Sequence, residues 1–190
     1  MKKVILMILM AMPLCAMAQD KEQGYLAGAV PEEGGLIVFR QTFDTKDKSQ
    51  ADVYATLQAC VKQLVAEARQ DLRTRVVSDE NNTIVARIEE IMTFKKKFLN
   101  WDHTYFRYII AADALPDGKA NVTIRNISYY YGFDQEGNKG EEYKAEEWIS
   151  DKAAINKAGT KLYPRSGKFR RKTVDRVAEI FSTFKEKLGN

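Results

Sequence analysis

Residues 74–131 contain four strand-like stretches in succession, separated only by short polar turns. In residues 83–94 apolar and polar side chains alternate, which is typical of an antiparallel strand that buries one face. The turn Pro116-Asp117-Gly118 joins the strand-like residues 104–114 to residues 120–131 as a hairpin. Because consecutive strands with short connections pair with their neighbours, this stretch predicts an antiparallel meander.

The apolar pattern shifts by one position within the last of these strands. Its apolar residues are first Ala120, Val122 and Ile124, and then Ile127, Tyr129 and Tyr131. An extra residue inserted in one strand of a pair produces such a shift, so we predict a β-bulge near Arg125 and Asn126.

Two amphipathic helices flank the meander. Ser49 is a candidate N-cap with Asp52 three residues later, and apolar residues from Val53 to Ala68 follow at helical spacing. Thr173 is the predicted cap of a second helix near the C-terminal end of the sequence. Since both helices need a surface for their apolar faces, we expect them on one face of the sheet.

The remaining segments complete the predicted element order. A strand over residues 36–43 precedes the first helix, and residues 141–172 are predicted to be an irregular segment with a short helix at 146–158 and a loop at 164–167. The order is then β-α-β4-α. The sequence therefore predicts one α+β domain over residues 19–190, an antiparallel sheet packed by two helices on one face. The other face of the sheet is expected to have no helix packed on it.

The first residues have the features of a secretory signal peptide. Lys2 and Lys3 form a positive end, an apolar stretch extends to Leu14, and Ala16-Met17-Ala18 is a typical cleavage site. The apolar stretch is shorter than the ~20 residues of a membrane-spanning helix. We therefore expect residues 1–18 to be a cleaved signal peptide. The mature protein is expected to be exported, periplasmic or secreted, without a transmembrane segment.

Residue counts exclude several kinds of site. Signal cleavage removes Cys15 and leaves Cys60 on the apolar face of the first helix, so no internal disulfide is expected. The single histidine, His103, and the neighbouring Asp102 are too few ligands for zinc. No glycine-rich phosphate-binding motif is present, and a net charge of +4 does not indicate nucleic-acid binding. We expect no metal, no cofactor and no nucleic-acid partner.

Two stretches of the sequence resemble a known family. Residues 25–31 and the following strand, residues 37–39, match its opening, and residues 143–151, 154–157 and 167–175 match a longer motif. The chain resembles the exported bacterial domain-of-unknown-function family 4468, which is described as having a TATA-binding-protein-like (TBP-like) fold. This resemblance covers essentially the whole mature chain and implies the β-α-β4-α order. It implies no known activity, because a fold does not define a function.

Aromatic and basic residues mark the candidate binding surface. Tyrosine and tryptophan suit binding sites because they combine a large apolar area with a polar group. Three consecutive tyrosines, residues 129–131, must place side chains on both faces of the sheet, and the helices cover only one. The predicted surface consists of Tyr105, Tyr108, Tyr129, Tyr131, Trp148, Arg165, Lys168, Arg170 and Arg171. The alternative is that residues 141–172 fold back and bury the aromatic side chains.

These observations favour a non-enzymatic binding or structural domain of the bacterial envelope. Its ligand or partner, a small molecule, lipid, glycan or protein, is expected on the open sheet face, rimmed by the basic segment Arg165–Lys172. The first alternative is a small-molecule or lipid carrier with a pocket between the sheet and the C-terminal helix. The weaker alternative is a hydrolase, although adjacent carboxylates on a strand, such as Glu89 and Glu90, point to opposite faces. No catalytic residue is predicted.

Overall fold

The computed structural model describes residues 22–45, 48–69, 71–98, 100–133 and 139–189, so the predicted signal peptide lies outside the described residues. The first elements are β1 (Glu32–Glu33), β2 (Leu36–Asp44) and α3 (Gln50–Glu67). Four long or medium strands follow: β3 (Arg75–Glu80), β4 (Thr83–Lys97), β5 (Asn100–Ala114) and β6 (Lys119–Tyr131). The chain continues with β7 (Glu141–Lys144), α4 (Ala145–Trp148), α5 (Asp151–Ala154) and α6 (Pro164–Leu188).

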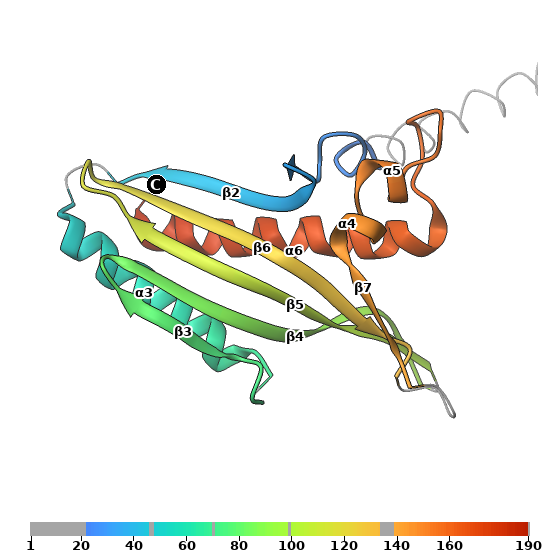
Figure 1. Ribbon diagram of the computed structural model, residues 1–190, viewed down its shortest axis with the longest axis horizontal. Helices are drawn as coiled ribbons and strands as arrows, with labels where there is room; N and C mark the ends of the chain where they lie inside the picture. The colour runs from blue at the N-terminus through green and yellow to red at the C-terminus, as the bar shows by residue number, and fades with distance from the viewer. Residues whose placement is uncertain (1–21, 46–47, 70, 99, 134–138, 190) are drawn as a thin grey trace, which may run out of the picture.

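The strands form one antiparallel sheet in the order β1-β2-β6-β5-β4-β3. Strands β3 to β6 pair with their neighbours in sequence, which confirms the predicted meander, and β2 lies beside β6 (Figure 1). Strand β7 also pairs with β6, along Ser128–Tyr131, beyond the part of β6 that pairs with β2. The strands β1 and β7 and the short helices α4 and α5 are additions to the predicted β-α-β4-α order.

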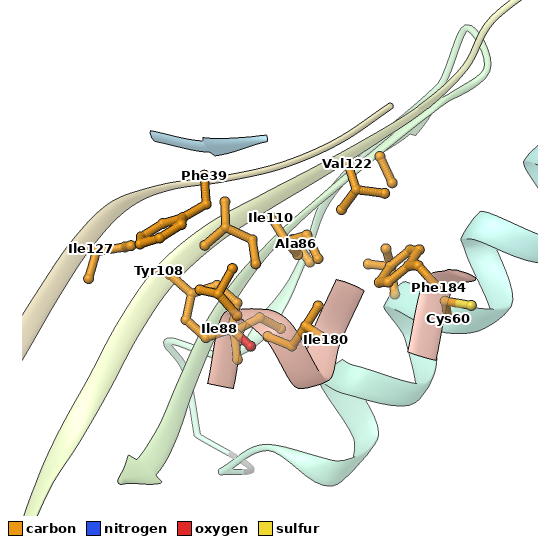
Figure 2. Packing of buried hydrophobic residues seen from close by; sticks show 14 of the residues in the cluster. Phe39, Cys60, Ala86, Ile88, Tyr108, Ile110, Val122, Ile127, Ile180 and Phe184 are labelled. Carbon is orange, nitrogen blue, oxygen red and sulfur yellow. The ribbon is translucent and has the colours of Figure 1, made fainter. Parts of the chain in front are cut away.

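Helices α3 and α6 pack on the same face of the sheet (Figure 1). Their inward residues, among them Cys60, Ile180 and Phe184, are buried against strand residues such as Ile88 and Ile110 (Figure 2). The predicted fold class, an α+β sheet packed by two helices on one face, is therefore confirmed. No helix in the described part of the chain covers the opposite face, which we call the open face.

Two local sequence signals have the structure that was predicted. Ser49 caps α3, because its hydroxyl accepts a hydrogen bond from the Asp52 N–H at 3.2 Å. The register between β5 and β6 shifts opposite Asn126, whose φ is +55°, which confirms the predicted bulge. Because of this bulge, Tyr129 and Tyr131 face the helices and Tyr130 faces the open side of the sheet.

The segment that was predicted to be irregular, residues 141–172, is more regular than its sequence indicates. Helix α6 begins at Pro164 and not at Thr173, because the first helical turn tolerates proline, whose missing N–H would have no partner there. Thr173 instead lies in the core, where its hydroxyl is 2.6 Å from that of Tyr129. Lys95–Lys97, which resemble a turn in sequence, extend β4.

Asp79 of β3 links this edge strand to α3. Its carboxylate accepts hydrogen bonds from the Gln58 amide at 2.5 Å and the Tyr54 hydroxyl at 2.7 Å, and it lies 3.1 Å from the Lys62 ammonium. These hydrogen bonds, followed by the charge of Lys62, lower the pKa of Asp79 to about 2.

We expect Asp79→Asn to reduce the acid sensitivity of the fold. Because the pKa of Asp79 is lower in the folded state than its ordinary value of 3.8, its contribution to stability is present above that value and is lost as the pH falls toward about 2. As the pH is lowered from 3.8 to about 2, the urea midpoint of the wild-type protein should therefore fall more than that of Asp79→Asn. Parallel curves for the two proteins would show that these contacts do not form in solution.

Candidate functional site

Polar and aromatic side chains form rows across β4, β5 and β6 on the open face. The register places Glu89 beside Arg107, and Arg107 beside Ser128. In the next row Tyr105 lies beside Tyr130. Side chains directly opposite one another on neighbouring strands are within contact distance. The candidate site, which we call the open-face site, consists of Arg69, Glu89, Trp101, His103, Tyr105, Arg107, Tyr130, Phe133 and Glu142.

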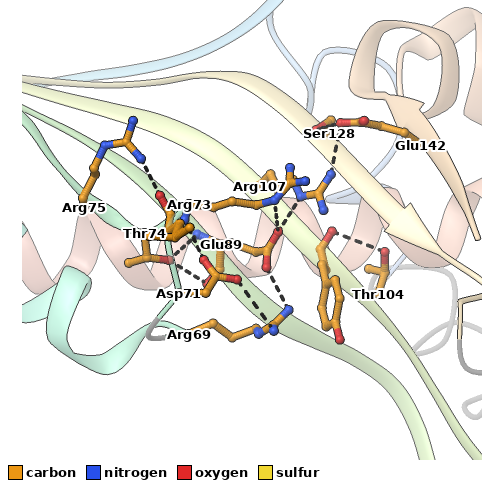
Figure 3. A network of polar contacts seen from close by, with 12 residues as sticks. Arg69, Asp71, Arg73, Thr74, Arg75, Glu89, Thr104, Arg107, Ser128 and Glu142 are labelled. Atoms are coloured by element: carbon orange, nitrogen blue, oxygen red, sulfur yellow. Dashed lines mark hydrogen bonds and ion pairs between the residues drawn. The ribbon is translucent and has the colours of Figure 1, made fainter.

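Glu89 is the buried centre of the polar part of this site (Figure 3). The residue is 1% exposed, and its carboxylate accepts hydrogen bonds from Arg69 at 2.8 Å and from Arg107 at 2.6 Å. Arg107 also donates to Glu142 of β7 at 3.3 Å. One carboxylate therefore holds two arginines, one that follows α3 and one from β5, in defined positions.

Aromatic rings extend the site from these arginines. The guanidinium carbon of Arg69 lies 4.0 Å from the centroid of the Tyr105 ring. Tyr105 and Tyr130 both stack on Phe133, with ring centroids 4.2 Å and 5.4 Å apart. The open face thus carries a connected set of rings whose positions are fixed by one another and by the arginines.

Trp101 and His103 form the outer end of the open-face site. Their rings stack with centroids 3.9 Å apart, and Trp101 remains 40% exposed, whereas His103 is buried. Nδ1 of His103 lies 3.0 Å from the Trp101 carbonyl oxygen. Within the described ranges, no group of three His, Cys, Asp or Glu side chains has the arrangement of a metal site.

Gly140 approaches the rings of this site so closely that a side chain would collide with them. A Cβ atom at Gly140 would lie 2.8 Å from Cζ of Tyr130 and 2.9 Å from Cβ of Phe133, and the φ of Gly140 is +73°. Gly159 has the same φ of +73° with no neighbouring atom within 4 Å, so it provides a matched control.

We expect Gly140→Ala to destabilise the protein more than Gly159→Ala. The left-handed backbone costs about 1 kcal/mol in each variant. Displacing the rings costs roughly 1–3 kcal/mol more in Gly140→Ala. Urea denaturation measures both losses, and near-ultraviolet circular dichroism should change for Gly140→Ala only. Equal losses would show that the rings do not pack against Gly140 in solution.

Three of the residues predicted for the binding surface lie in the core. Tyr108 and Tyr129 are at most 1% exposed and face the helices, and Arg170 of α6 is fully buried. The prediction that these residues form a surface is wrong, because strand alternation and the β6 bulge direct both tyrosines inward. Burial raises the pKa of Tyr108 and of Tyr129 above the ordinary value.

Four predicted residues, Tyr131, Trp148, Arg165 and Lys168, come together around Phe169 on the helix side of the sheet. The Lys168 ammonium donates to the Tyr131 hydroxyl at 2.8 Å, and the Arg165 guanidinium lies 5.3 Å from the centroid of the Trp148 ring. The Phe169 ring contacts the rings of both Tyr131 and Trp148. These residues therefore form a second cluster that is separate from the open face.

Tyr105 is the one predicted residue that lies on the open face. Arg171 pairs with Glu22 at 2.9 Å beside α6. The prediction that the basic segment Arg165–Lys172 rims the open face is therefore wrong, because this segment lies in α6 on the helix side of the sheet. The sequence reasoning missed Arg69, Arg107 and Tyr130 as site residues. The apolar shift in β6 was a usable signal for Tyr130, because it reverses the faces of the tyrosines.

The space between the sheet and the middle of α6 is filled with side chains. Val177, Ile180 and Phe184 are at most 3% exposed and belong to the core. A groove of about 580 Å3 lies at the side of α6, next to Glu90–Thr93 of β4, and charged as well as apolar residues line it. An open groove of this kind differs from the enclosed apolar pocket that the carrier alternative requires.

Glu89 and Glu90 point to opposite faces of the sheet, as strand alternation predicts. Glu89 binds the arginines of the open face, whereas Glu90 accepts a hydrogen bond from Arg176 of α6 at 3.0 Å. The two carboxylates therefore cannot act together on one substrate.

Among the described helices, none combines the length and the apolar character needed to cross a bilayer.

The fold defines the class of this protein, an α+β domain with a TBP-like fold. A TBP-like protein from Parabacteroides distasonis has the same fold at 18% identity, with a TM-score of 0.66 over 85% of this chain and 98% of that chain. A DUF4468 family protein from Bacteroides ovatus is 36% identical, with a TM-score of 0.80 over 89% of this chain and 95% of that chain. The family profile, described as a domain of unknown function with TBP-like fold, matches residues 39–130. The chain belongs to the DUF4468 family, which confirms the resemblance found in the sequence. No curated protein matches the chain.

Proposed function

We propose that the protein is a non-enzymatic binding domain of the bacterial envelope, and that its open-face site receives a protein or glycan partner. The main support is the set of stacked rings and positioned arginines on a sheet face that no described helix covers. Tyrosine, tryptophan and arginine are the residues that most often dominate the energy of binding surfaces.

The shape of the open-face site favours a large partner. Sites for small molecules are concave and enclose most of the ligand, whereas this site lies on a sheet surface. Tyr105 and Tyr130 are half-buried and Trp101 is 40% exposed, so parts of these rings are accessible to a partner. Since Glu89 already holds Arg69 and Arg107, little side-chain entropy is lost when they contact a partner.

The engagement of the carboxylates in the groove beside α6 supports a role without catalysis. Glu90 and Glu179 pair with Arg176, and Asp175 accepts a hydrogen bond from the Tyr25 hydroxyl. A general acid or base needs a carboxyl group that can reach a substrate. These groups are instead committed to internal contacts.

The proposed location outside the cytoplasm rests on the signal-peptide features of residues 1–18. N-terminal sequencing of the protein from the periplasmic fraction tests this location. A chain that begins at Gln19 supports export, and an uncleaved chain confined to the cytoplasm contradicts it.

Native mass spectrometry of the protein purified from the periplasm of its own cells tests binding at the open face. We expect the wild-type protein to retain a partner and Trp101→Ala to lose it. Tyr163→Ala is the matched control, because Tyr163 is 43% exposed, similar to the 40% of Trp101, and lies at the start of α6. Equal retention by both variants would contradict the proposed site.

A further inference from the structure

Beyond residue 87, one edge of β4 has no partner strand among the described residues. Strand β3 pairs with residues 83–87, and β5 pairs with the other edge of β4 as far as Lys97. At Glu89 the backbone groups on the β3 edge of β4 have other partners. The Glu89 N–H donates to the Thr74 hydroxyl, and the Glu89 carbonyl accepts from the Arg69 N–H. After Glu89 the strand is held in place by β5 and is open on its other side.

The backbone groups of Ile91 and Thr93 point to this open edge. In an antiparallel strand, the N–H and C=O groups of alternate residues point to the same edge, so those of Ile91 and Thr93 follow the direction of Glu89. In the parts of the chain that the structure describes, no backbone group or side chain hydrogen-bonds to them there. Two donors and two acceptors are therefore available in register, which is what an added strand requires.

A groove runs along this edge, between β4 and α6. It has a volume of about 580 Å3, with Glu90–Thr93 on one wall and Lys172, Arg176 and Glu179 on the other. Its apolar lining consists of Ile91, Met92, Phe106 and Ala178, of which Ile91 is 43% exposed. An extended peptide in this groove would pair with β4 and place alternate side chains against α6.

Two exposed lysines at this groove form no ion pair with a described residue, although the lining also holds the carboxylates of Glu90, Asp175 and Glu179. The acidic groups Glu90 and Glu179 pair with Arg176, and Asp175 is bonded to Tyr25. Lys172, and Lys95 two residues beyond the groove on β4, are exposed, and no ion pair to a described residue engages either of them. Lysines at a strand edge also disfavour pairing between two copies of the chain.

We propose that the open edge of β4 and the facing side of α6 form a second binding site, which takes an extended acidic peptide of a partner protein by β-strand addition. The free backbone groups supply the pairing, and Lys172 and Lys95 supply the preference for acidic residues. This site is separate from the open-face site, because its wall is the helix α6 on the other side of the sheet.

Selection of random twelve-residue peptides displayed on phage, with the full mature chain as bait, tests this proposal. The selected peptides should be rich in aspartate and glutamate, and amide hydrogen exchange at Ile91 and Thr93 should slow when they bind. No enrichment, enrichment of peptides without acidic residues, or slower exchange only on the open face would overturn the proposal.

Two variants test the roles of charge and backbone separately. Lys172→Glu should weaken binding of the selected peptides about tenfold, equivalent to ~1.4 kcal/mol. Lys157→Glu makes the same charge change on an exposed loop and should leave binding unchanged. Thr93→Pro removes one outward N–H, which an edge strand tolerates, and should abolish peptide binding. Because it also removes the hydroxyl that accepts a hydrogen bond from Nε1 of Trp101, Trp101→Ala is its control and should leave peptide binding unchanged. Unaltered binding to Lys172→Glu and Thr93→Pro, with both variants folded, would overturn strand addition at this edge.

Discussion

Arg170→Ala is expected to lower the free energy of unfolding by roughly 3–5 kcal/mol, the cost of breaking a buried charge network. Arg170 is fully buried and donates to the carbonyl oxygens of Tyr25, Leu26 and Ile149 and to the carboxylate of Asp151, at 2.5–2.7 Å. Alanine would leave these acceptors without their donor and would open a cavity in the core. Arg170 thereby connects the N-terminal segment and the α4–α5 region to α6.

The adjacent residue provides the control for Arg170→Ala. Arg171 pairs with Glu22, and both side chains are 38% exposed, so Arg171→Ala should cost at most about 1 kcal/mol. Arg170→Lys keeps the charge but cannot reach all the acceptors, so its loss should lie between those of the two alanine variants. Urea denaturation of the three variants measures this order. Similar losses for Arg170→Ala and Arg171→Ala would contradict the described network.

Glu89→Gln is expected to destabilise the fold by roughly 3 kcal/mol, because it removes the negative charge that compensates two arginines. The side chain of Arg107 is only 14% exposed, so its charge would be left half-buried without its closest counter-ion. Since the amide has a single oxygen, it can no longer accept from both Arg69 and Arg107, so the arrangement that holds Arg69 over Tyr105 is weakened. We therefore expect a second effect, weaker binding at the open-face site, measured with the partner that the wild-type protein retains.

Glu142→Gln is the matched control for Glu89→Gln. Both substitutions remove a carboxylate that binds Arg107, but the side chain of Glu142 is 56% exposed. The Glu142 variant should lose at most about 1 kcal/mol of stability. Equal losses for the two variants would show that Glu89 is not the centre of the network.

The fold could be predicted from the sequence wherever the signal was local and periodic. The alternation in residues 83–94, the cap at Ser49 and the phase shift at Asn126 each appear in the structure as expected. The start of α6 was missed because Pro164 and a nearby glycine resemble a loop, whereas proline also fits the first turn of a helix. Strand β7 is short and polar, and only its pairing with β6 defines it.

The residues of the candidate site could be predicted only in part. Some have a local signal in the sequence, whereas others are positioned by contacts between distant segments. The shift in β6 groups Tyr129 with the apolar residues, which is a signal for burial, but the predicted surface included Tyr129 because the tyrosines were assigned to the open face as a group. The inward position of Arg170 follows from its helical spacing to Thr173 and Val177, which are also buried. The contact of Arg69 with Glu89 spans 20 residues and depends on how the chain after α3 meets β4, which no local pattern contains.

Site-specific photo-crosslinking in living cells tests whether the open face binds a partner. A photoreactive phenylalanine analogue replaces Tyr105 or Tyr130 on the open face, or Tyr163 on the helix side as a control. We expect crosslinked adducts from the two open-face positions and none from position 163, detected by mass spectrometry of the purified protein. Adducts from position 163 alone, or from none of the three positions, would contradict binding at the open face.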